Sequence, residues 1–152
     1  MKSLLTNAIF SFVVFCLFLL VLEIILRPTH LFNARISWSE PDETYGWRFA
    51  PGAEYWNRPA EGGRSSGIIN SYGWRDVEWS LKKAAGIYRV AVVGDSYVEA
   101  FQVESSETFL KIAENMLSNK GHKVELMNFG RSGFTTTEEL LVIRDEVVQI
   151  FS

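Results

Sequence analysis

Two short segments of the chain combine the residue types from which a nucleophilic site can be built. One is Gly94-Asp95-Ser96-Tyr97, which follows an apolar run, and the other is Asn128-Phe129-Gly130-Arg131-Ser132-Gly133, which follows a second one. A serine exposed in a turn after a buried strand can attack a carbonyl carbon when nearby N–H groups stabilise the oxyanion that forms. Gly-Asp-Ser is also a common turn and helix N-cap sequence, so catalysis and a purely local role both stay open.

The elements around these segments predict how the segments are positioned. Residues 88–93 and 123–128 are expected strands, and the first ends in a continuous apolar run, typical of a strand buried on both faces of a parallel sheet. Between them an apolar stripe predicts a helix that Ser105 or Ser106 caps and Gly121 ends. A second helix is expected over 136–150. The stripe of the first helix is Phe109, Ile112, Ala113, Met116 and Leu117, and the second helix is expected to bury Leu140, Ile143 and Val147.

The alternating order of strands and helices predicts an α/β fold with a parallel sheet and right-handed crossovers. Ligands of such sheets bind outside the carboxyl ends of the strands. If the two strands pair, Ser96 and the glycine loop after the second strand are neighbours at that edge. The predicted topology therefore brings a candidate nucleophile and candidate oxyanion donors together.

Composition excludes several other kinds of site. The 152 residues hold 15 Lys and Arg against 18 Asp and Glu, a net charge of −3, without the basic cluster that a nucleic-acid binder needs. One cysteine, Cys16, and two histidines cannot supply a zinc site, so no metal and no organic cofactor is implied. Neither G-x-G-x-x-G nor a P-loop occurs, and Val98 stands where a G-x-S-x-G elbow has its second glycine.

An apolar segment near the N-terminus predicts contact with a lipid membrane. Residues 4–26 contain one charged residue, Glu23, and 23 helical residues span about 35 Å, enough for a hydrocarbon core of about 30 Å. A cleaved signal peptide would need a small-x-small cleavage site, which the residues after this segment lack, so we expect an uncleaved single-pass anchor. A cleaved signal and a buried helix remain as alternatives. The flanking charges Lys2, Arg27 and Arg35 do not settle which end of the helix lies in the cytoplasm.

The segment between the anchor and the first strand is rich in aromatic residues, glycine and proline. It lacks a sustained helical or strand period, which predicts turns and short strands. Tyr-Gly-Trp-Arg occurs at 45–48 and again at 72–75, too few copies for a repeat architecture. Disordered segments are poor in aromatic residues, so we expect this one to pack onto the strands and helices after it. The predicted organisation is an anchor over 1–27, an aromatic lead segment over 28–87 and an α/β part over 88–152.

These motifs together resemble a known family. Val92-Val93-Gly94-Asp95-Ser96-Tyr97 and Asn128-Phe129-Gly130-x-x-Gly133 resemble the first two motif blocks of the SGNH, or GDSL-type, hydrolase superfamily. The apolar segment ending in Glu-x-x-Leu-Arg, the first Tyr-Gly-Trp-Arg, and Asn70-x-x-Gly73-x-Arg75 are similar to the membrane-anchored bacterial branch of that superfamily. The resemblance implies the start of a flavodoxin-like parallel-sheet domain, with the globular part outside the cytoplasm.

The resemblance also assigns roles to residues. It implies that Ser96 is the nucleophile, that the N–H groups of Ser96 and Gly130 bind the oxyanion, and that Gly94, Asp95 and Asn128 support the motif. Asp95 is expected to order the turn rather than to move protons. Ala100 departs from the family, which often has glycine there, and Val98 stands where a small residue is common. Arg131 and Tyr97 flank the site and are candidates for substrate contact as well as ordinary surface residues.

The base of the family's triad is not among these motifs. The third-block asparagine and the late Asp-x-x-His of the family do not occur in this sequence. His122 is expected at the opposite edge of the sheet and His30 near the lipid head groups, out of hydrogen-bond reach of Ser96. We therefore expect a front part of a longer enzyme that is inactive by itself.

The resemblance implies an esterase acting on an ester such as an acylated carbohydrate. The alternatives are an O-acetyltransferase for a surface polysaccharide and a non-catalytic envelope protein whose aromatic segment binds a glycan or partner. If the reading frame after Ser152 encodes the third-block asparagine and Asp-x-x-His, the protein is expected to be an enzyme. A stop codon there would indicate an inactive remnant. The sequence makes no prediction of oligomeric state.

Overall fold

The structure is a computed structural model that describes residues 2–26, 38–57 and 64–151, in two compact units, Met1–Ala34 and Arg35–Ser152. The first unit contains helix α1 (Lys2–Leu26). Its stretch Leu4–Leu26 is apolar and long enough to cross a membrane, a property that an uncleaved anchor shares with a signal sequence. The free thiol of Cys16 is exposed on this helix.

The second unit begins with two small hairpins in the aromatic lead segment. Strands β1 (Ser39–Asp42) and β2 (Gly46–Phe49) pair antiparallel, as do β3 (Glu54–Asn57) and β4 (Ser65–Ile68). Their side chains build an aromatic cluster onto which Phe101 packs from the α/β part. The predicted turns and short strands are confirmed. The buried members of this cluster are Trp38, Phe49, Tyr55, Ile69 and Phe101.

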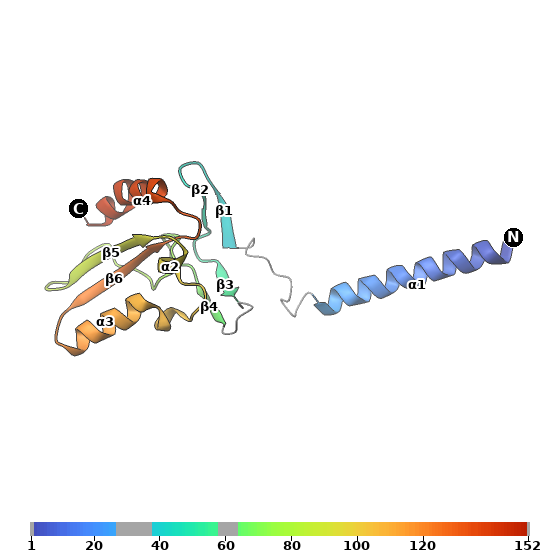
Figure 1. Cartoon of the computed structure of the whole chain (residues 1–152), viewed down its shortest axis with the longest axis horizontal. Helices are drawn as coiled ribbons and strands as arrows, with labels where there is room; N and C mark the ends of the chain where they lie inside the picture. Colours follow the sequence, from blue (N-terminus) through green and yellow to red (C-terminus); the bar gives the residue numbers. More distant parts are fainter. Residues whose placement is uncertain (1, 27–37, 58–63, 152) are drawn as a thin grey trace. The chain divides into compact units, whose positions relative to one another are not determined.

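The α/β part contains the predicted parallel pair of strands. Strand β5 (Tyr88–Gly94) pairs with β6 (Val124–Gly130), with Tyr88 opposite Val124 and Gly94 opposite Gly130. Figure 1 shows helices α3 (Phe109–Asn119) and α4 (Thr136–Val142) on opposite sides of these strands. The short α2 (Ser96–Glu99) and the 3₁₀ turn η3 (Ser105–Glu107) connect β5 to α3, and the π-turn η4 (Ile143–Val147) and α5 (Val148–Phe151) continue α4.

The helix boundaries differ in detail from the expectation. Ser105 lies in η3, and the N-cap of α3 is Thr108, whose hydroxyl accepts a hydrogen bond from the Lys111 N–H. The helix ends where predicted, with Gly121 in the left-handed region at φ +84°. The cap lies two or three residues beyond the serines because a 3₁₀ turn precedes the helix.

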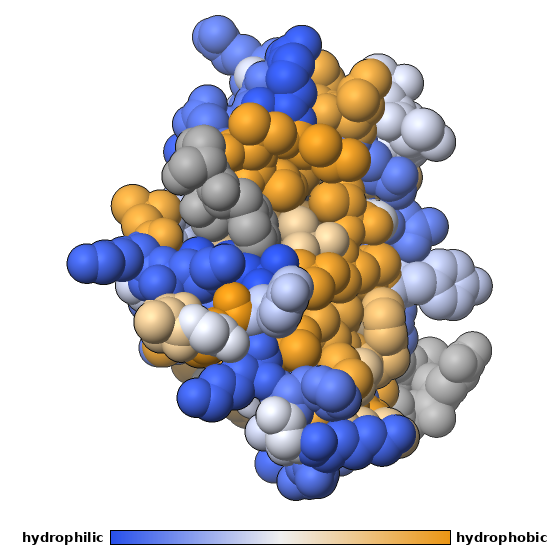
Figure 2. All heavy atoms as spheres, turned by 90° about the vertical axis from the view of Figure 1, so that its left-hand side faces the viewer, coloured by the Kyte–Doolittle hydropathy of each residue, from blue (hydrophilic) through white to orange (hydrophobic). Residues whose placement is uncertain are grey.

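Burial of the helices and of β5 is less complete than the sequence patterns predict. Leu140 is 63% exposed and Ile143 43%, so the expectation that both are buried is wrong, and Val142 is buried instead. Val90 of β5 is 43% exposed, so this strand is not covered on both faces. A sheet of two strands is narrower than the helix faces packed against it. Figure 2 shows the resulting band of apolar surface.

The lead segment packs against the α/β part, as its aromatic content predicts. Trp74 and Trp79 belong to one buried cluster with Met127 and Phe129 of β6. The rings of Trp79 and Phe129 lie 4.8 Å apart, and those of Trp74 and Phe129 lie 5.2 Å apart. Lead segment and sheet therefore share one core.

Candidate active site

Ser96 lies where the sequence predicts, in the turn that follows β5. It is half-buried and is the first residue of α2. The carboxylate of Asp95 caps this helix by accepting the Tyr97 N–H at 2.9 Å, and the Asp95 carbonyl accepts the N–H of Val98 and that of Glu99. Asp95 thus orders the turn, the role expected for it, and the capping and nucleophile interpretations of Gly-Asp-Ser are compatible.

Two glycines allow α2 to lie directly on the strand ends. A Cβ atom on Gly94 would lie 2.4 Å from Cγ2 of Val98, and one on Gly130 would lie 2.2 Å from the backbone N of Glu99. Both distances are far below a van der Waals contact. The Arg131 N–H donates to the Gly94 carbonyl at 3.0 Å, which continues the strand pairing into the loop after β6. The turn that carries Ser96 is therefore held by the close packing of α2 on the two strand ends.

Asn128 connects α2 to the end of β6. Its Nδ2 donates to the Val98 carbonyl at 2.9 Å, and its Oδ1 accepts the Gly130 N–H at 2.8 Å. This is a supporting role of the kind expected for Asn128. It also engages the N–H of Gly130, so that group would bind an oxyanion only after Asn128 releases it. For the Ser96 N–H, the structure shows no acceptor within 2–26, 38–57 and 64–151.

A buried arginine from the lead segment holds the other end of α2. Arg75 Nη1 donates to the carbonyls of Glu99 and Ala100 at 2.9 and 3.0 Å, and Nη2 donates to the Val103 carbonyl at 2.6 Å. Carbonyls at a helix C-terminus lack partners within the helix, and Arg75 supplies them. Ala100 has a left-handed backbone at φ +54°, which explains why glycine would suit that position.

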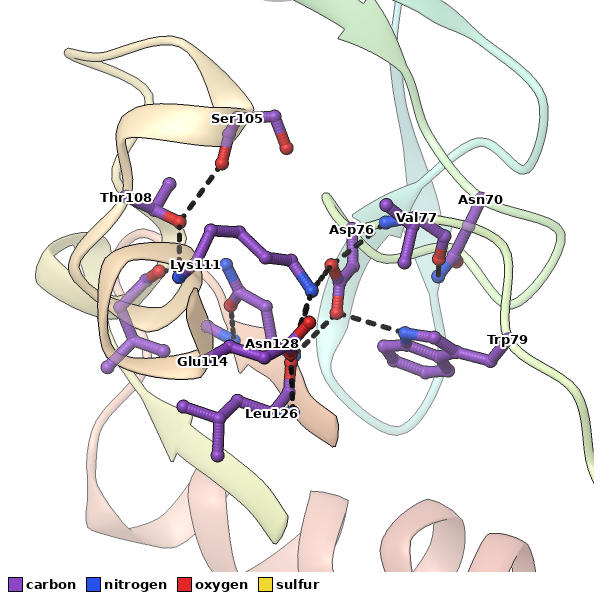
Figure 3. A network of polar contacts seen from close by, with 12 residues as sticks. Asn70, Asp76, Val77, Trp79, Ser105, Thr108, Lys111, Glu114, Leu126 and Asn128 are labelled. Carbon is purple, nitrogen blue, oxygen red and sulfur yellow. Dashed lines mark hydrogen bonds and ion pairs between the residues drawn. The ribbon is translucent and has the colours of Figure 1, made fainter. Parts of the chain in front are cut away.

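Asp76, the next residue, ties the lead segment to β6 and α3 (Figure 3). Its Oδ2 accepts hydrogen bonds from the Asn128 N–H and from Trp79 Nε1, both at 2.9 Å, and its Oδ1 lies 3.1 Å from Lys111 Nζ. The Asp76 side chain is almost fully buried, where only a paired carboxylate is tolerated. Through Asn128, this ion pair is connected to the turn that carries Ser96.

Arg131 does not contact solvent beside Ser96, so the suggestion that it faces a substrate is wrong. It is 1% exposed, and its guanidinium lies 4.2 Å from the centre of the Trp74 ring. Burial lowers the pKa of Arg131 to about 10, and the charge of Glu146 opposes that shift. Tyr97, in contrast, is 83% exposed. The rings around the guanidinium are those of Tyr45, Trp47, Phe49, Trp74 and Phe134.

A pocket of about 350 Å³ opens beside α2. Glu99, the last residue of α2, lines it, although this carboxylate is only 2% exposed. Ser132 from the loop after β6 also lines the pocket and donates its hydroxyl to Glu99. The other lining residues are Trp38, Ser39, Trp47, Phe49, Phe101 and Gly133.

The two histidines are not placed as bases for Ser96. His122 is exposed and precedes β6, whereas Ser96 follows β5, and the parallel register puts these points at opposite ends of the strands. His30 lies outside the described residues. In the part of the chain that the structure describes, no histidine reaches Ser96 and no group of acidic, histidine or cysteine side chains could hold a metal ion.

Sequence reasoning missed Arg75, Asp76 and Glu99 as parts of this site. The signal that could have found them is a charged pair inside an aromatic segment, Trp74-Arg75-Asp76, and an acidic residue one helical turn after Ser96. Neither signal shows which residues these charged side chains contact.

No family model and no curated protein matches this chain.

Proposed function

We propose that residues 88–152 form the start of a flavodoxin-like SGNH (GDSL-type) hydrolase domain, and that Ser96 is the nucleophile of a membrane-anchored esterase. The observation that carries this proposal is the position of Ser96 at the carboxyl end of β5, held by the close packing of α2 on Gly94 and Gly130. The substrate class is an ester such as an acylated carbohydrate, and the globular part lies outside the cytoplasm.

In the proposed reaction the Ser96 hydroxyl oxygen attacks the ester carbonyl, and the hydroxyl proton passes to a base. The carbonyl oxygen becomes an oxyanion, which the Ser96 N–H binds and which the Gly130 N–H can bind if Asn128 releases it. The alcohol leaves with a proton, and water then hydrolyses the acyl-serine. In this proposal the described residues provide the nucleophile and the N–H donors for the oxyanion. The base that accepts the Ser96 proton has to come from outside them.

Supplying a base in solution tests the proposal. The full chain, in micelles of a sugar-free detergent, is mixed with an aryl acetate with and without 100 mM imidazole, and the rate of the Ser96→Ala variant is subtracted. A general base contributes about 10² to 10⁴-fold in enzymes, and a diffusing imidazole recovers part of that. We expect no measurable Ser96-dependent rate without imidazole, and with imidazole a Ser96-dependent rate at least tenfold above the detection limit. Equal rates for the two proteins in imidazole would refute Ser96 as a nucleophile.

Acetyl transfer to a surface polysaccharide is the alternative outcome of the same chemistry. Both reactions pass through an acyl-serine and differ in whether water or a sugar hydroxyl accepts the acyl group. Product analysis with an added sugar as competing acceptor separates them.

A further inference from the structure

The two outer edges of the strand pair β5–β6 differ in their partners. On the outer edge of β6, Glu114 accepts the Leu126 N–H at 2.7 Å and Asp76 accepts the Asn128 N–H at 2.9 Å. Lys111 Nζ donates to the Leu126 carbonyl at 3.3 Å. Side chains of α3 and of the lead segment therefore close this edge, in the way that native proteins usually protect a strand edge.

The outer edge of β5 is open. The backbone groups of successive residues in a strand point to opposite sides, and the Tyr88 N–H and the Gly94 carbonyl bond to residues next to the two ends of β6. The N–H and carbonyl groups of Ala91 and Val93 consequently point outward. Among the described residues, the structure shows no hydrogen-bond partner for these four groups. We call them the open edge of β5.

Strand β5 also lacks the features that keep edge strands from pairing. Such strands are usually protected by proline, by outward charges or by a bulge. β5 contains no proline and pairs with β6 without a bulge. Its one charged side chain, Arg89, is bound to Glu125 of β6 at 2.7 Å and is only 3% exposed. An edge of this kind is a template for a further strand.

Apolar side chains border the open edge on the face that α3 covers. Val90 is opposite Leu126 in the register, so both lie on this face, where Leu126 is buried and Val90 is 43% exposed. Lys111 marks the side of α3 that faces the outer edge of β6. The helical period puts three half-exposed apolar side chains on the other side of α3, toward the open edge. They are Phe109, Ile112 and Met116.

The face that α4 covers is bordered in the same way. Helix α4 lies over β5, and its Val142 is buried in the shared core. Leu140, Ile143 and Val148, which follow one another along this helical stretch, are 43–63% exposed. Figure 2 shows the apolar surface as a band across this side of the molecule. With the three side chains of α3 and with Tyr88 and Val90 of β5, eight large apolar side chains border the open edge.

This apolar surface is large enough for a dimer interface. Each of the eight side chains is about half exposed and offers on the order of 80–100 Å², since a large aromatic side chain buries about 150–250 Å². Together they offer roughly 600–800 Å², close to the ~800 Å² that each partner contributes to a standard protein–protein interface. The largest apolar patch of a typical monomer is about 300–600 Å².

We propose that two copies of this chain pair through the open edge of β5 and form one four-stranded sheet. The edge is self-complementary, because an antiparallel pair about a two-fold axis puts Ala91 of one protomer opposite Val93 of its partner. All four outward groups of each copy are then hydrogen-bonded. The axis is perpendicular to the sheet, so α3 meets its counterpart on one face and α4 on the other. The proposal goes beyond the proposed function, because strand pairing requires no nucleophile.

A distance measurement in a lipid bilayer tests the arrangement. The full chain carries one nitroxide on Lys123→Cys, an exposed position just before β6, in a Cys16→Ala background. It is reconstituted in phosphatidylcholine vesicles at a low protein-to-lipid ratio and studied by pulsed electron paramagnetic resonance. In the proposed register the two Lys123 Cα atoms lie about 36 Å apart, from a strand rise of about 3.3 Å and a strand spacing of about 4.8 Å. We expect a single distance peak near this value.

Three variants locate the contact. Val90→Lys puts a charge on the border of the open edge and should abolish the peak. Ala91→Pro removes an outward N–H without removing a hydrogen bond to β6, and it should abolish the peak as well. The matched control Ile68→Lys changes an equally apolar side chain, 61% exposed on β4, and should keep the peak. Thermal unfolding of each variant, followed by tryptophan fluorescence, shows whether it is folded.

Several results would overturn the dimer. One is a wild-type chain that shows no distance peak, and another is a peak that persists in folded Val90→Lys. A peak more than about 10 Å from the expected value would also contradict this register. Loss of Ser96-dependent hydrolysis in the imidazole experiment would leave the dimer untouched, so the two proposals fail separately.

Discussion

Gly94 and Gly130 face each other at the carboxyl ends of β5 and β6, and α2 packs on both, with its backbone over Gly130 and the Val98 side chain over Gly94. The turn that carries Ser96 can lie this close to the sheet because neither strand end has a side chain. One packing contact thus explains Gly94 and Gly130, whereas Gly133 has a left-handed backbone at φ +84° with open space around it.

Substituting these glycines should destabilise the protein in a graded manner. A Cβ on Gly130 would lie 2.2 Å from a backbone nitrogen, which cannot move alone, whereas one on Gly94 would meet the movable end of Val98. We expect Gly130→Ala to cost about 3 kcal/mol or more and Gly94→Ala less, as for overpacked cores. Tryptophan fluorescence during thermal unfolding measures both, because all five tryptophans lie within 38–79.

Gly121→Ala is the control for the graded series. Gly121 has a left-handed backbone and open space around it, so alanine there incurs only backbone strain, about 1 kcal/mol. A Gly130→Ala variant no less stable than Gly121→Ala would contradict the packing of α2 described here.

The two Tyr-Gly-Trp-Arg segments provide a matched pair of arginine substitutions. Arg75 is 2% exposed and donates to three carbonyls around the end of α2, whereas Arg48 has a 47% exposed side chain and pairs with Glu40. A lysine cannot reproduce the fixed geometry of the guanidinium, so Arg75→Lys should destabilise by about 2 kcal/mol or more. Arg48→Lys should change stability by less than about 1 kcal/mol. Equal losses of stability in the two variants would refute the role of Arg75 in holding the end of α2.

Ala100→Gly should stabilise the chain. Ala100 is the one non-glycine residue with positive φ among the described residues, and a left-handed alanine is strained by about 1–2 kcal/mol. Losing a nearly buried methyl group offsets about 0.8 kcal/mol of this gain. We expect a net increase of about 0.5 kcal/mol, against a decrease of about 1 kcal/mol for Ala113→Gly inside α3. A lower stability of Ala100→Gly than of the wild type would show that the methyl contact outweighs the strain.

Stability should fall at alkaline pH partly because of Tyr45. Burial, followed by the nearby charge of Glu146, raises the pKa of Tyr45 in the folded chain above its ordinary value near 10. Above pH 10 the unfolded chain loses this proton and the folded chain keeps it, so stability decreases as pH rises. Tyr45→Phe removes this contribution, and its free energy of unfolding should decline less steeply between pH 9.5 and 11.5. Identical slopes would contradict the shift.

The sequence patterns predicted those features that depend on neighbours along the chain. The strands at β5 and β6, the helix stop at Gly121 and the turn at Asp95 follow from local apolar runs, glycine conformation and capping. Exposure of Leu140 and Ile143 could not be predicted, since the helical period marks an apolar face but does not show whether a sheet is wide enough to cover it.

The sequence patterns also could not predict which residues far apart in the chain contact each other. Asp76 and Asn128 are 52 residues apart and Arg131 and Trp47 are 84 apart, and nothing in the local pattern of either residue specifies the other. An arginine in a glycine loop is usually a surface residue, and the local sequence gives no reason to expect otherwise for Arg131. Its ring-lined, buried position depends on an aromatic segment that precedes it by more than fifty residues.

The most direct test of Ser96 as the nucleophile is to locate the acyl group. The full chain is incubated with an aryl acetate and imidazole, quenched and digested, and acetylation of each serine-containing peptide is followed by mass spectrometry. We predict that Ser96 is acetylated at least tenfold faster than the exposed Ser71 and Ser106, and that denaturation removes this preference. Acetylation of Ser96 at the rate of the exposed serines in the folded chain would contradict its role as a nucleophile.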